Sequence, residues 1–240
     1  MTDILSTLPY VLDFVFGSLA IGFGIQEISK AAAVRVSGVI ELKTNADLIQ
    51  YLAAKSMLTN DKMIKSMLAI DRIGFISTCW SAPYQDSSLP IMDEMEGYAM
   101  ASRKNASPEL ISLVLDELAC NITQTGEPLQ ILHLPTGSGY TACILAEFVG
   151  SEGSVVSIEP QEPIRKLAEK NVRKYYPDLR DRLTIVECED IPSLPKIHKK
   201  IGAYDVIIYT GAVERVPPES LRILLKPNGI ILAPVGRGNE

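Results

Sequence analysis

The stretch Leu129–Gly150, LQILHLPTGSGYTACILAEFVG, decides the fold. Its first six residues are mostly apolar, which predicts a short buried strand over 129–134. The glycine-rich segment PTGSG follows at once and leads into a predicted helix. A strand that passes through such a turn into a helix is typical of α/β folds that bind a ligand at the turn.

The sequence after this stretch alternates strands with helices. Further strands are predicted at 154–159, 183–188, 205–209 and 230–234. Helices are predicted over 218–225 and over 163–175, where Asn171 shares one face with apolar residues. Because strands separated by helices pair in parallel through right-handed crossovers, we expect an α/β sandwich with a mostly parallel sheet and helices on both faces.

The composition excludes several classes of protein. The chain of 240 residues carries 23 Lys and Arg against 29 Asp and Glu, and this net charge of −6 argues against a general nucleic-acid binder. The four cysteines are far apart without a C-x-x-C pair, and there are only two histidines. The sequence therefore predicts no metal centre and no disulfide framework.

The N-terminal segment is unusually apolar. Between Ile4 and Ile25 the only charged residue is Asp13, and this length would suit a membrane crossing. A proline and three glycines weaken that interpretation, so a helical segment that is buried or packed on a partner is favoured. Both alternatives stay open. We predict an apolar extension over 1–44 and an α/β domain over 45–240.

Two helices are predicted before the glycine-rich stretch. Asn45 is the expected cap of a helix over 46–57. A second helix is expected over 62–70, capped by Thr59 or Asn60. Its methionines recur at helical spacing and are therefore interpreted as core residues.

Glycines and acids follow neighbouring predicted strands, whose carboxyl ends meet at one edge of a parallel sheet. Glycine lets the backbone approach a ligand closely. Glu159 ends the second strand, where an acid can bind ribose hydroxyls, and Asp190 follows the third, where an acid can accept from an adenine amine. We predict a site for a nucleoside-bearing cofactor built from Thr136, Gly137, Ser138, Gly139, Glu159 and Asp190.

Longer motifs surround the turn. They include MLTNDKMIKSMLAIDRIGFI and APYQDSSLPI before it, and SVVSIE, KNVRKYYPDL, YDVIIYTGA and LLKPNGIILAPVG after it. With these motifs the stretch from about Asn45 to Gly236 resembles the protein-L-isoaspartate O-methyltransferases. These enzymes use S-adenosylmethionine (AdoMet) to methylate damaged aspartyl residues of proteins.

The resemblance implies a fold, a cofactor and a reaction. The fold is the Rossmann-like sandwich of class I methyltransferases. Gly137 and Gly139 would cradle AdoMet, Glu159 would bind its ribose, and Asp190 would lie beside adenine. The reaction would be methylation of a peptide or protein carboxylate, and the family default is a cytoplasmic location, with a mitochondrial or membrane-associated one left open by the apolar N-terminus.

Two positions at the turn depart from the family. Pro135 replaces a glycine, and because proline lacks an amide donor we expect a cofactor contact to be lost there. His133 replaces an acid that helps to hold the methionine part of AdoMet. His133 is interpreted as a buried core histidine or, alternatively, as a neutral substitute for that acid.

The segment that would bind the substrate also departs from the family pattern. The family motif T-I-S-A-P-H-M has its nearest match in NASPEL, with Ala106 in the serine column and Glu109 in the histidine column. Ser107 lies one residue later, a displacement of more than about 3 Å. Ser107 and Asp86 are the catalytic candidates.

Two classes of function follow. One is an AdoMet-dependent carboxyl methyltransferase. The other is a catalytically inactive relative that serves as a binding or structural subunit of a larger assembly, whose association with a membrane is left open. The family pattern continues beyond PVG into further strands, and with this sequence ending at Glu240 we expect the domain to lack them.

Overall fold

The computed structural model describes residues 41–76, 82–91, 104–122, 127–188, 202–211 and 219–235. The apolar segment 4–25 and Asp190 lie outside these residues, so the predictions about them stay predictions. None of the described helices is both long and apolar enough to cross a membrane.

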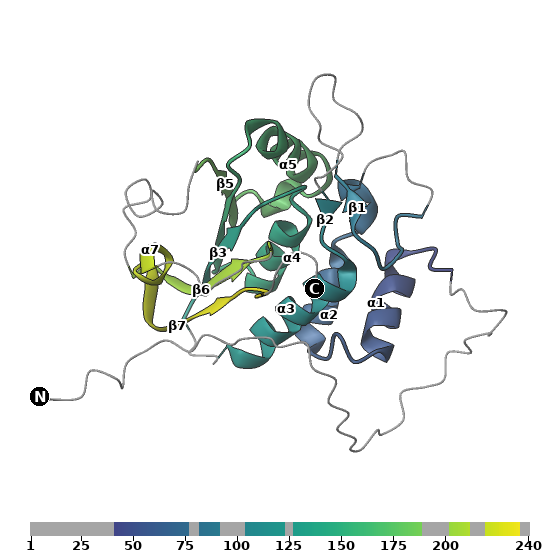
Figure 1. Ribbon diagram of the computed structural model, residues 1–240, viewed down its shortest axis with the longest axis horizontal. Coiled ribbons are helices and arrows are strands. Elements are labelled where there is room, and N and C mark those ends of the chain that lie inside the picture. Colours follow the sequence, from purple (N-terminus) through teal and green to yellow (C-terminus); the bar gives the residue numbers. More distant parts are fainter. Residues whose placement is uncertain are drawn as a thin grey trace, which may run out of the picture.

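A five-stranded sheet forms the centre of the molecule (Figure 1). Its order is β5-β4-β3-β6-β7, and each neighbouring pair is parallel. The strands are β3 (Gln130–Leu134), β4 (Ser154–Ile158), β5 (Leu183–Val186), β6 (Tyr204–Tyr209) and β7 (Leu225–Leu232), and a separate antiparallel pair joins β1 (Leu89–Pro90) to β2 (Lys104–Asn105). The prediction of a parallel α/β sheet is confirmed.

Helices cover the sheet, and Figure 1 shows α1, α2 and α3 grouped on one side with α7 far from them. The helices are α1 (Asn45–Ala54), α2 (Asp61–Ala69), α3 (Pro108–Asn121), α4 (Tyr140–Val149), α5 (Glu162–Tyr175) and α7 (Glu219–Arg222), with short 3₁₀ helices η1 (Arg72–Phe75) and η3 (Pro177–Leu179). Helix α2 packs against α4, and both α1 and α3 pack against α2.

Two apolar cores lie on the two faces of the sheet. Consecutive residues of β3 alternate between them, so that Ile131 belongs to the core with α1 to α5 and Leu132 to the core with α7. A sheet that is buried on both faces needs strands that are almost continuously apolar, which is the pattern of β3, β4 and β6.

The cap of α1 corrects one prediction. Thr44, not Asn45, is the N-cap, and it forms a capping box with Asp47. Asn45 is buried instead, and its side-chain amide donates to the carbonyl oxygens of Met67 and Ile70 at 3.0 and 3.3 Å. This contact spans more than 20 residues, which local helix rules do not include. The expected cap of α2 by Asn60 is confirmed.

Other boundaries also differ from the predictions. The helix predicted over 218–225 is too long, because α7 ends at Arg222 and β7 begins at Leu225. The segment KPNG continues the strand through a register shift against β6. Helix α3 was not predicted, although Ile111, Leu115 and Leu118 show helical spacing and are buried.

A buried arginine holds the loop before β1. Arg72 is fully buried, and its guanidinium donates to the carbonyl oxygens of Pro83, Gln85 and Ser87 at 3.1, 2.6 and 2.8 Å. Burial lowers the pKa of Arg72 to about 10, so the group keeps its charge at neutral pH. One side chain therefore satisfies three backbone acceptors of a loop without regular structure.

A carboxylate joins three strands at the amino edge of the sheet. Oδ2 of Asp205 in β6 accepts from the backbone amide of Gln130 in β3 at 2.8 Å. Both carboxylate oxygens accept from Nζ of Lys226 in β7 at 2.9 Å. The amino ends of β3, β6 and β7 are thereby tied together by a charged group.

We expect Arg72→Ala to lower the free energy of unfolding by about 3 kcal/mol, because it leaves the three loop carbonyls without donors. The matched control is Arg180→Ala, whose side chain is 81% exposed and which should cost less than about 0.5 kcal/mol. Equilibrium urea unfolding measures both. Equal losses in the two variants would contradict the role given to Arg72.

Candidate active site

The glycine-rich turn lies at the carboxyl end of β3 and leads directly into α4, as predicted. Gly137 and Gly139 have φ of +58° and +94°, a backbone conformation that other residues rarely adopt. A Cβ atom on Gly139 would lie 3.5 to 3.6 Å from Val172 and Ala168 of α5, whereas one on Gly137 would have nothing within 4 Å. The turn is therefore packed at Gly139 and open at Gly137.

Glu159 follows β4 and points to the turn. Its Oε2 accepts from the amide of Gly137 at 2.9 Å, and its Oε1 accepts from the amide of Gln161 at 3.2 Å. The side chain is only 3% exposed. The parallel pairing of β3 with β4 thus places an acid against the open glycine, where the sequence expects a ribose-binding carboxylate. That cofactor role stays a prediction.

Ser138 anchors the turn to two other parts of the chain. Its hydroxyl donates to Oδ1 of Asn105 in β2 at 2.6 Å, and its carbonyl oxygen accepts from Nδ2 of Asn171 in α5 at 3.0 Å. Sequence reasoning missed both contacts. The one available signal was Asn171, a polar residue on the inward face of an amphipathic helix.

His133 is a buried core histidine. It pairs with Ser157 of β4 in the sheet register, and its Nδ1 lies 2.8 Å from Oγ of Ser157. That hydroxyl lies 2.7 Å from Oγ1 of Thr136 in the turn. Burial lowers the pKa of His133 to about 3, so the ring is neutral at physiological pH. Of the two interpretations of His133, the structure therefore agrees with the buried core histidine.

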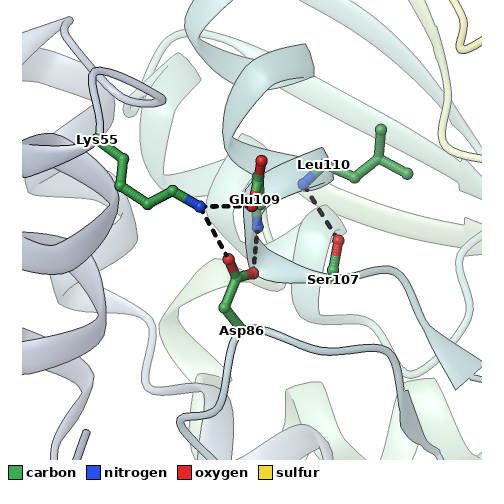
Figure 2. Close-up of polar contacts among 5 residues, drawn as sticks. All are labelled: Lys55, Asp86, Ser107, Glu109 and Leu110. Atoms are coloured by element: carbon green, nitrogen blue, oxygen red, sulfur yellow. Dashed lines mark hydrogen bonds and ion pairs between the residues drawn. The ribbon is translucent and has the colours of Figure 1, made fainter. Parts of the chain in front are cut away.

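The two catalytic candidates, Asp86 and Ser107, both lie at the start of α3 and contact different backbone amides there (Figure 2). Ser107 is the N-cap, and its hydroxyl accepts from the amide of Leu110 at 3.3 Å. Oδ1 of Asp86 accepts from the amide of Glu109 at 2.9 Å. Nζ of Lys55 lies 2.8 Å from Oε2 of Glu109 and 3.9 Å from Oδ2 of Asp86.

The charges in this cluster shift one another's pKa. Burial raises the pKa of Asp86. The hydrogen bond from the backbone amide of Glu109 opposes that effect, whereas the side chain of Glu109 adds to it. The hydrogen bond from Lys55 lowers the pKa of Glu109 and raises that of Lys55. One cation thus partly compensates two carboxylates at the helix start.

The structure brings most of the predicted site together. Asn105 contacts the turn and lies two residues before Ser107, so the glycine-rich turn and the start of α3 adjoin. Ala106, in the serine column of the family, packs against the apolar core. Among the described ranges, no group of three or more His, Cys, Asp or Glu side chains is arranged to hold a metal ion.

A cavity of about 560 Å³ lies at the amino edge of the sheet, opposite the edge that carries the glycine-rich turn. Residues at the amino ends of strands and beside Phe148 line it, among them Leu129, Asp205 and Gly229. It is separate from the glycine-rich turn, which lies at the carboxyl edge.

The strand order, the turn after β3 and the acid after β4 define the class as a Rossmann-like methyltransferase fold. A crystal structure from Plasmodium falciparum, described as a protein-L-isoaspartate O-methyltransferase in complex with S-adenosyl-L-homocysteine, superimposes with a TM-score of 0.67. The two sequences are 20% identical, and the superposition covers 82% of this chain and 87% of the Plasmodium chain. This likeness shows the fold.

The family follows from the sequence comparisons. Residues 43–240 match the model of the protein-L-isoaspartate(D-aspartate) O-methyltransferase family, and the chain belongs to that family. The protein-L-isoaspartate O-methyltransferase of Methanococcoides burtonii is 30% identical over 186 residues, 77% of this chain and 81% of the relative. That of Caenorhabditis elegans is 27% identical over 199 residues, 82% and 81% of the two chains. A solved structure of the same name is 25% identical with a TM-score of 0.64, and covers 80% of this chain and 55% of that one.

The buried His133 predicts a pH dependence of stability. Its pKa falls from 6.5 to about 3 on folding, so the unfolded chain binds more protons between these values. The stabilising contribution is complete above about pH 6.5 and decreases as the pH falls. Between pH 7.5 and 5.0 the loss from this residue should be about 2 kcal/mol.

The measurement compares wild type with His133→Gln by urea unfolding at both pH values. Glutamine does not titrate, so the difference in unfolding free energy between the two proteins should change by about 2 kcal/mol in favour of the variant at pH 5.0. A difference that is the same at both pH values would show that His133 is not held neutral.

Proposed function

We propose that this chain is an AdoMet-dependent protein carboxyl methyltransferase that acts on isoaspartyl residues. The observation that supports this proposal most is the open face of the turn at Gly137, with the carboxylate of Glu159 against it. The inactive-subunit alternative is not favoured, because the chain matches an enzyme family over 43–240.

The residues at the turn fit AdoMet. Gly137 leaves room for a ligand at its Cβ position, and its positive φ lets the backbone approach that ligand. Glu159 would accept from ribose hydroxyls at the end of β4, as acids do in nucleotide sites of this topology. Pro135 offers no amide, and the amides of Thr136 and Gly137 donate to the carbonyl oxygen of Ile158 and to Glu159, so the amide of Ser138 would carry the backbone contact.

When bound, AdoMet supplies an electrophilic methyl group. A substrate carboxylate is already ionised at neutral pH, because such groups titrate near pH 4, and the site therefore needs no strong base. The chain's contribution would be to position the carboxylate and to limit its repulsion by other acids. Asp86 is engaged in holding the start of α3, so we assign it a structural part in the site.

Ser107 is the side chain that would orient the carboxylate. Its oxygen accepts from the amide of Leu110, which leaves the hydroxyl proton as a donor. Lys55 would offset the negative charge of Asp86 and Glu109 next to an anionic substrate. A hydroxyl donor and an ammonium group would act on a substrate that is already ionised, so no proton has to be removed from it.

Cofactor binding is tested by calorimetric titration with S-adenosyl-L-homocysteine. Gly137→Ala should lower the affinity about tenfold or more, because the methyl group enters the open face, and should cost about 1 kcal/mol of stability from its positive φ. Gly202→Ala is the matched control: its φ is +62°, its Cβ position lies 3.7 Å from the carbonyl oxygen of Leu225, and it precedes β6 at the amino edge. No binding to wild type, or equal effects of the two variants on affinity, would contradict the proposal.

Methyl transfer is tested with labelled AdoMet and an isoaspartyl peptide, compared with the same peptide containing aspartate. We expect Ser107→Ala to lower kcat/KM for the peptide about tenfold, since a hydrogen bond to a charged group is lost. It also removes a helix cap, at about 1 kcal/mol of stability. Asn60→Ala removes the cap of α2 at similar cost and should leave kcat/KM unchanged. A similar loss of activity in both variants would assign the effect to stability alone.

A further inference from the structure

Asn105 connects the two halves of the proposed site. It lies in β2, two residues before Ser107 on the substrate side, and its side chain contacts Ser138 in the turn on the cofactor side. We propose that Asn105 is a positioning residue that couples binding of the carboxylate substrate to binding of the cofactor. This inference rests on the proposed function.

The orientation of the Asn105 amide follows from its two partners. Nδ2 donates to the carbonyl oxygen of Phe75 at 2.9 Å, an acceptor that cannot donate. Oδ1 must then face Ser138, whose hydroxyl donates to it at 2.6 Å. Asn105 is 8% exposed, so neither contact is readily replaced by water.

Ser138 is placed to transmit a change in the turn. It lies between Gly137 and Gly139, which both have positive φ, and Gly137 forms the open face. A ligand that restrains the turn also restrains the Ser138 hydroxyl, and through it Asn105 and the start of α3. The path from turn to Ser107 consists of one short hydrogen bond and two peptide units.

The second anchor of Ser138 separates coupling from simple support of the turn. Asn171 holds the carbonyl oxygen of Ser138 from α5, and it belongs to the cofactor side. Loss of Asn171 should weaken cofactor binding without affecting the substrate side. Loss of Asn105 should break the connection between the two sides.

The experiment measures the affinity for S-adenosyl-L-homocysteine by calorimetry with and without a saturating isoaspartyl peptide. In wild type the peptide should raise the affinity about fivefold or more, the usual scale of coupling between sites. The ratio of the affinity with peptide to the affinity without it measures this coupling. In Asn105→Ala this ratio should fall to about 1, and KM for the peptide should rise more than kcat falls. In Asn171→Ala the affinity should fall while the ratio persists.

Asn45→Ala is the control for a merely structural effect. Asn45 is 7% exposed and donates to carbonyl oxygens of Met67 and Ile70, neither of which lies in the turn, in β2 or in α3. Its variant should lose stability and keep both the affinity and the ratio. If Asn105→Ala does not fold, Ser138→Ala removes the same hydrogen bond with a smaller change, and is measured in the same way.

The outcomes distinguish this inference from the proposed function. Wild type that does not bind S-adenosyl-L-homocysteine would overturn the proposed function itself. Wild type that binds it with a ratio of 1, or an Asn105→Ala variant that retains the wild-type ratio, would overturn the coupling alone. A ratio lost in Asn45→Ala as well would assign the effect to general stability and likewise overturn the role of Asn105.

Discussion

The parallel register of β3 with β4 and β6 is the constraint on which the site depends. It aligns the carboxyl ends of these strands, so that the turn after β3 and Glu159 after β4 meet at one edge. Antiparallel pairing would place these residues at opposite edges. The register in turn requires helices between the strands and burial on both faces, which the apolar strands and the helices of the two cores provide.

Apart from the carboxylate of Glu159, the groups that hold the carboxyl edge are neutral and polar. The turn is fastened through Ser138 to two buried asparagines and through Thr136 and Ser157 to a neutral histidine. Hydrogen bonds between buried neutral groups have definite directions and avoid the desolvation cost of charges. Such a turn is preorganised for a ligand, because its backbone does not have to be ordered when the ligand binds.

The fold was largely predictable from the sequence, because strand and helix periodicities and the glycine-rich turn are local signals. Glu159 was located for the same reason, since it ends a predicted strand, and in the structure it directly follows β4. Asn105 was not, because its contact with Ser138 joins residues 33 positions apart and β2 is only two residues long. Ser107 was recognised as a hydroxyl but not as a helix cap, because α3 itself was not predicted.

The two edges of the sheet are stabilised by different forces. At the amino edge, the half-exposed pair of Asp205 and Lys226 joins β6 to β7, and Asp205 also accepts from β3. Dissolved salt screens such a pair, whereas it hardly affects hydrogen bonds between buried neutral groups. A rise in ionic strength should consequently loosen the edge distant from the turn first, and local opening of the sheet would begin there while the ligand-facing edge keeps its shape.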